Sequence, residues 1–72
     1  MEKKDKKEIN RIRVVLAEKY RTNKWLAKHL KKTPSTVSKW CNNAIQPSLE
    51  TLLEIANALD VDIKDLLNSS KN

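Results

Sequence analysis

The sequence contains no glycine and no phenylalanine, and it has only two prolines and one cysteine in 72 residues. With few helix-breaking residues and abundant Leu, Ala, Lys and Glu, the composition favours helices throughout. Cys41 has no partner for an internal disulfide. No apolar run approaches the roughly 20 residues that span a membrane, and the charged N-terminus is unlike a signal peptide. The sequence therefore predicts a helical protein of a reducing compartment, the cytoplasm.

Residues that build catalytic or metal centres are also scarce. His29 is the only histidine, and no second cysteine exists to share a metal with Cys41. The sequence has no glycine-rich phosphate loop and no recognisable Ser–His–Asp arrangement. A chain of 72 residues forms one domain with a thin core, too small to enclose a substrate and a catalytic apparatus. We therefore expect no enzyme activity, no metal and no cofactor, with His29 at the surface and Cys41 in the core.

Positive charge is concentrated in the first part of the chain. The net charge is +6, but residues 1–40 hold 13 Lys and Arg against 4 Asp and Glu, whereas residues 41–72 hold 2 against 5. A basic segment attracts a polyanion, and DNA is the commonest such partner. The alternative is that the lysines only keep a small protein soluble, and charge alone does not decide between the two.

Apolar residues recur at helical spacing in five segments joined by short connections. The expected helices cover residues 8–20, 23–30, 34–41, 49–59 and 63–68, with N-caps at Thr22, Thr33, Ser48 and Asp62. The residues expected to face the core are Ile9, Ile12, Val15, Leu16, Leu26, Ala27, Leu30, Val37, Trp40, Leu49, Leu52, Leu53, Ala56, Leu59, Ile63, Leu66 and Leu67. The sequence thus predicts an all-α, compact five-helix bundle over residues 8–68, between a flexible charged leader (1–7) and a tail (69–72).

Residues 23–40 have the form of a helix-turn-helix. Two short helices meet there across a turn of three or four residues, and Ala27 supplies the small side chain that steeply crossing helices need. Val37 and Trp40, three residues apart, are expected to hold the second helix against the bundle. The opposite, polar face of that helix is then free to contact another molecule, as in a recognition helix.

Residues 9–67 resemble the Cro/phage-repressor type of helix-turn-helix domain, often called the XRE family. The resembling stretches are INRIRVVLAEK (9–19), TNKWLAKHL (22–30), TPSTVSKW (33–40), QPSLETLL (46–53) and residues 55–67. The resemblance implies a lambda-repressor-like fold of five helices and sequence-specific binding of double-stranded DNA through a recognition helix at about 33–41. It also implies a transcriptional regulator, most often a repressor, that forms a homodimer whose contact can depend on DNA. No membrane partner and no small-molecule effector is expected.

The polar face of the third expected helix supplies the candidate DNA contacts. Ser35 and Lys39 are the first choices for base edges, because Lys donates to the guanine acceptors and Ser can serve several bases. Asn23 and Thr33 stand at helix N-termini that should point at phosphates. The full expected set is Asn23, Thr33, Pro34, Ser35, Thr36, Ser38, Lys39, Asn42 and Asn43.

Two further questions stay open in the sequence. Trp25 lies off the apolar stripe, so it either shields the aliphatic stem of Lys32 or packs on the DNA backbone.

A protein-interaction module, such as an antitoxin or an adaptor, is the alternative function. The basic segment argues against protein interaction as the sole role, and salt-dependent binding to random duplex would discriminate the two.

Four features depart from the pattern of the family that the sequence resembles. Lys31 stands where the family usually has Gly, and Lys32 where it has an apolar residue. Asn43 also replaces a usual Gly, and Asn tolerates left-handed backbone. Lys31 either takes another turn or accepts strain of about 1 kcal/mol. Leu16 and Cys41 replace an Arg and a Glu that pair inside many members; because both charges are absent together, we expect two buried apolar groups in contact.

Overall fold

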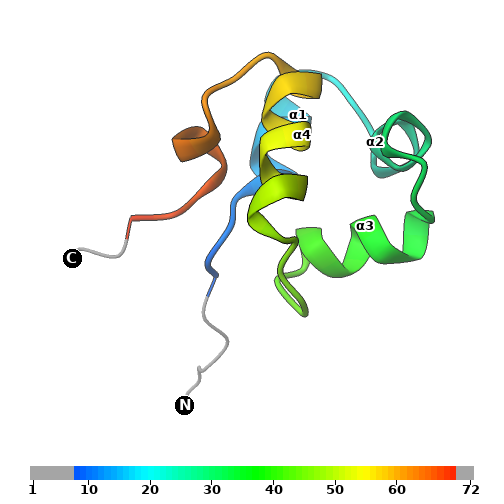
Figure 1. Ribbon diagram of the computed structural model, residues 1–72, viewed down its shortest axis with the longest axis horizontal. Coiled ribbons are helices and arrows are strands. Elements are labelled where there is room, and N and C mark those ends of the chain that lie inside the picture. The colour runs from blue at the N-terminus through cyan, green and yellow to red at the C-terminus, as the bar shows by residue number, and fades with distance from the viewer. Residues whose placement is uncertain (1–7, 70–72) are drawn as a thin grey trace.

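The computed structural model describes residues 8–69. In this range the chain forms α1 (Ile12–Glu18), α2 (Asn23–Leu30), α3 (Pro34–Cys41), α4 (Leu49–Leu59) and a short 3₁₀ helix, η1 (Ile63–Leu66) (Figure 1). The all-helical prediction is confirmed, but the prediction of five α-helices is wrong, because the last segment forms only a single 3₁₀ turn. The predicted leader 1–7 and residues 70–72 of the predicted tail lie outside the described residues. None of the described helices is long and apolar enough to cross a membrane.

Local hydrogen bonds explain where the middle helices begin. Thr22, Thr33 and Ser48 each accept a hydrogen bond from the backbone N–H three residues later, as N-cap residues do. Asp62 and Asp65 form a reciprocal capping box at η1. The predicted bounds of α2 and α3 are therefore confirmed, since the signals that set them lie within a few residues of each helix.

The core lies between α1, α4 and the α2–α3 pair (Figure 1). Its buried apolar residues are Ile12, Val15, Leu16, Leu26, Ala27, Val37, Trp40, Cys41, Leu52, Ile55, Ala56, Leu59 and Leu66. Burial of Leu16 and Cys41 is confirmed. The predicted inner face of α4 is partly wrong, because Leu49 and Leu53 are 72% and 53% exposed while Ile55 is fully buried. The buried stripe of α4 follows the spacing 52, 55, 56 and 59, which places residues 49 and 53 on an adjacent face.

Helix α1 begins four residues later than predicted, because residues 9–11 pair with residues 66–68 through backbone hydrogen bonds. The Arg11 N–H donates to the Leu66 carbonyl at 2.8 Å, within an isolated antiparallel bridge between Asn10 and Leu67. Ile9, predicted to be in the core, is consequently exposed, as is much of Leu67. Pairing between segments so distant in sequence leaves no periodic signal.

All four α-helices end in the same way, although the chain has no glycine. A residue beyond each helix has a left-handed backbone with φ between 58° and 60°; these residues are Tyr20, Lys31, Asn43 and Asp60. The N–H of the next residue then donates to a carbonyl five residues earlier at 2.8–3.0 Å, which is the Schellman motif. A left-handed backbone costs residues with a Cβ about 1–2 kcal/mol. Lys31 therefore accepts the strain and does not adopt another turn.

Replacing Lys31 with glycine should raise the free energy of unfolding by about 0.5–1 kcal/mol, because the relief of left-handed strain exceeds the entropy that glycine adds to the unfolded chain. Urea denaturation measures the change. Lys28→Gly, inside α2, is the matched control and should lower the free energy of unfolding by about 1 kcal/mol. If both variants were destabilised equally, the left-handed strain at Lys31 would be refuted.

Candidate nucleic-acid interface

Helices α2 and α3 pack on each other through side chains that exclude water. Leu26, Ala27 and Val37 are each at most 1% exposed, and Trp40 extends the same buried face of α3. The small Ala27 side chain permits the close approach that the sequence predicted. Because α3 is only eight residues long and its apolar face is buried, the side that it turns outward is fixed.

The outer side of α3 carries most of the predicted DNA contacts. Pro34, Ser35 and Lys39 are exposed, while Thr36 and Ser38 are half-buried. Helix α3 lies at one edge of the molecule, with the core on its other side (Figure 1). A rigid polar helix face at an edge has the shape that the major groove admits.

The first turn of α3 is closed by two threonine hydroxyls. The Thr33 hydroxyl accepts a hydrogen bond from the Thr36 N–H at 3.2 Å, and the two hydroxyl oxygens lie 3.0 Å apart. One hydroxyl donates to the other, so the second keeps its proton for an outside acceptor. Thr33 and Thr36 therefore provide one hydrogen-bond donor at the helix N-terminus.

Asn23, at the start of α2, is oriented by the end of α3. The Cys41 thiol donates to the Asn23 Oδ1 at 3.4 Å. Burial raises the pKa of the Cys41 thiol more than nearby Arg13 lowers it, so the thiol keeps the donated proton at neutral pH. With its oxygen engaged, the Asn23 side chain has its amide N–H groups available as donors.

Asn43 has a structural role that the sequence did not reveal. Its Oδ1 accepts hydrogen bonds from the backbone N–H groups of Ile9 and Asn10, both at 2.9 Å, and from Gln46 at 3.1 Å. Its Nδ2 donates to the Asn10 carbonyl at 3.1 Å. The buried Asn10 amide in turn donates to the Trp40 carbonyl and to Gln46. Both the oxygen and the nitrogen of the Asn43 side chain are thus bonded within the protein, whereas its neighbour Asn42 is exposed.

Trp25 lies within a stack on the outer side of α2. Its ring is 5.1 Å from that of His29, and the Arg21 guanidinium carbon lies 4.6 Å from its ring centre. Trp25 and Lys32 line the same groove, but the stacking partners of the ring are Arg21 and His29. The expected surface position of His29 is confirmed.

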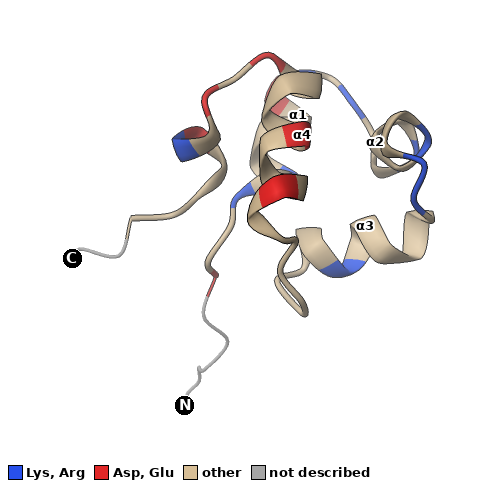
Figure 2. Cartoon of the chain, viewed as in Figure 1, with Lys and Arg blue, Asp and Glu red and all other residues tan. Residues whose placement is uncertain are grey.

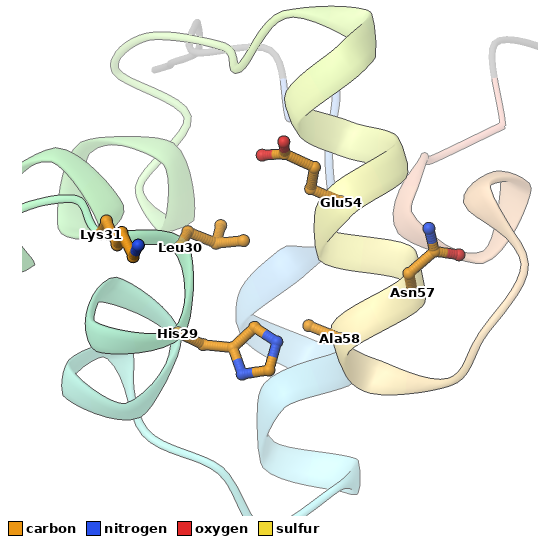
Figure 3. A pocket seen from close by; sticks show the side chains of 6 residues that line it. All are labelled: His29, Leu30, Lys31, Glu54, Asn57 and Ala58. Atoms are coloured by element: carbon orange, nitrogen blue, oxygen red, sulfur yellow. The ribbon is translucent and has the colours of Figure 1, made fainter.

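Charge is distributed unevenly over the described residues. Lys residues lie on α2 and on the turn that leads to α3, where there is no Asp or Glu, while α4 carries Glu and no Lys or Arg (Figure 2). The remaining charged residues of this range lie on or next to α1, on α3 and around η1. A pocket of about 420 Å³ lies between the basic α2 and the acidic α4. Its two sides are formed by His29, Leu30 and Lys31 from the end of α2 and by Glu54, Asn57 and Ala58 from α4 (Figure 3). Because this pocket combines both signs of charge, it does not suit a phosphate.

The packed α2–α3 pair and the outward polar face of α3 define a helix-turn-helix domain. Residues 11–71 match the Cro/C1-type HTH DNA-binding domain, and the chain belongs to this family. The chain is also similar to the crystal structure of a "putative DNA-binding protein from Bacteroides fragilis", with 53% identity and a TM-score of 0.83. That match covers 83% of this chain and 97% of the other. No curated protein matches.

The Asn43 hydrogen bonds should be worth more to stability than the side chain of its neighbour. Asn43→Gly keeps the left-handed backbone accessible but removes the acceptor of the Ile9 N–H and of the N–H of the buried Asn10, so it should lower the free energy of unfolding by about 2 kcal/mol. Asn42→Gly is the control and should change it by about 1 kcal/mol or less. Urea denaturation of both variants distinguishes them, and an Asn43→Gly variant as stable as the wild type would contradict the structural role.

Proposed function

We propose that this domain inserts α3 into the major groove of double-stranded DNA and regulates transcription, acting as a repressor in the cytoplasm. The observation that carries the proposal is the fixed orientation of α3, with Val37 and Trp40 buried and Ser35 and Lys39 exposed. Membership of a DNA-binding family supports the nature of the partner. Repression requires only that the domain be bound at its DNA site, because a bound domain excludes other proteins from the same DNA.

Base recognition is assigned to the outer face of α3. Lys39 is long enough to reach a base edge and suits the O6 and N7 acceptors of guanine. Ser35 contacts a neighbouring base, with Pro34 and Ser38 beside it on the groove walls. Short side chains such as Ser35 discriminate weakly, so DNA shape and bridging water contribute to specificity.

Phosphate contacts are assigned to the helix termini around α3. The Asn23 amide and the free hydroxyl of the Thr33–Thr36 pair are donors at the N-termini of α2 and α3, where the helix dipole also favours an anion. Asn42 is exposed just beyond α3 and reaches the same strand. Asn43 acts indirectly, since its side chain holds the loop after α3 in place.

We further propose that two copies bind a palindromic site. A single recognition helix contacts too few base pairs, each worth about 1–3 kcal/mol, to select one site in a genome. Exposed apolar side chains lie at the start of α4 and just before it, at Ile45, Leu49 and Leu53. Their burial in a modest dimer contact would place two α3 helices on half-sites about 34 Å apart.

The first test is the salt dependence of binding. If about 4–6 phosphates are neutralised per subunit, the logarithm of affinity should fall with the logarithm of salt concentration at a slope of about −4 to −5 per subunit. Fluorescence anisotropy with a labelled random duplex measures this slope. Affinity independent of salt would remove the nucleic-acid function and favour a protein-interaction module such as an antitoxin or an adaptor.

The second test separates base contacts from phosphate contacts. Lys39→Ala should relax the preference at one or two base pairs, whereas Asn23→Ala should weaken all sites about equally. Selection of bound duplexes from a random pool, with the wild type and both variants, measures the preferences. An unchanged motif for Lys39→Ala would contradict the assigned base contact, and a motif without two-fold symmetry would contradict the dimer.

A further inference from the structure

An open groove of about 470 Å³ runs along α2 to the start of α3. Lys24, Lys28 and Lys32 line it, and no acidic residue does. All three lysines are exposed, and none forms an ion pair with a carboxylate of residues 8–69. The groove thus presents three uncompensated positive charges, unlike the pocket between α2 and α4, which also contains Glu54.

The arrangement of these lysines favours an anion with repeated charges. Lys24 and Lys28 are one helical turn apart, with Cβ atoms about 5–6 Å from each other, so their like charges repel in the free protein. A partner whose negative charges repeat along a strand relieves this repulsion at both positions. The half-buried Trp25 ring, with the Arg21 guanidinium over it, adds a rigid wall and a further positive charge.

The groove also opens beside the proposed recognition surface. Pro34, the first residue of α3, lines the groove, and so does Thr22, which directly precedes Asn23. The basic side of α2 adjoins the start of α3, and neither these two helices nor the turn between them carries an Asp or Glu (Figure 2). The groove that Lys24 and Lys28 line is therefore continuous with the N-terminus of α3, the helix proposed to enter the major groove.

We infer that this groove holds the phosphate backbone of the duplex that α3 reads, so that Lys24, Lys28 and Lys32 extend the DNA contact beyond α3 and the helix termini. The inference rests on the proposed function and deepens it. The three lysines set the strength of binding at every DNA sequence and leave base preference to α3.

The test compares two variants with equal loss of charge. Lys24→Gln/Lys28→Gln removes two lysines of the groove, and Lys19→Gln/Lys64→Gln removes two exposed lysines outside it. Anisotropy with a labelled random duplex over a series of salt concentrations should give a slope about 2 units shallower for the groove variant, since each lost phosphate contact removes about 0.9. The control variant should lose less than about half a unit, because it removes no contact and changes only the long-range field.

The outcomes separate this inference from the proposed function. If the wild type shows a steep slope and both variants change equally, the groove inference is overturned while DNA binding by α3 stands. If the wild type itself binds duplex without salt dependence, both are overturned. Circular dichroism of the two variants checks that the exposed substitutions leave the helices folded.

Discussion

Helix α3 is held in place by the burial of Val37, Trp40 and Cys41 among residues of α1, α2 and α4. Each large apolar side chain removed from water contributes about 1.5–3 kcal/mol. Rotating this short helix about its axis would expose these side chains and bury Lys39 without a partner. The same packing that stabilises the fold therefore fixes which polar side chains face outward, and the proposed DNA contacts depend on it.

Side-chain hydrogen bonds add to the apolar packing that holds α3 in place. Asn10 and Asn43 tie the extended N-terminal segment to the end of α3, and the Cys41 thiol orients Asn23 across the two helices of the helix-turn-helix. Asn43, whose side chain binds the N-terminal segment, has a left-handed backbone and is asparagine and not glycine. Asn43 thus serves both the backbone turn and the hydrogen-bond network, and a glycine would supply only the first.

The sequence predicted the parts of the structure that local signals determine. Helices α2 and α3 begin and end where the Thr22 and Thr33 caps and the apolar spacing place them. The start of α1 and the 3₁₀ form of η1 were missed, because both depend on pairing between the chain ends. For the same reason Asn43 was expected to face DNA, since the backbone groups of Ile9 and Asn10 that it binds lie more than 30 residues away.

The outer face of α3, with the adjoining side of α2, is the surface that we propose meets DNA. Amide chemical shifts of ¹⁵N-labelled protein, recorded while a duplex is added, map that surface residue by residue. We expect the largest changes over residues 33–39 and around Asn23, Lys24 and Lys28, with little change in η1. Changes concentrated on α4 and η1, with α3 unaffected, would contradict this proposal.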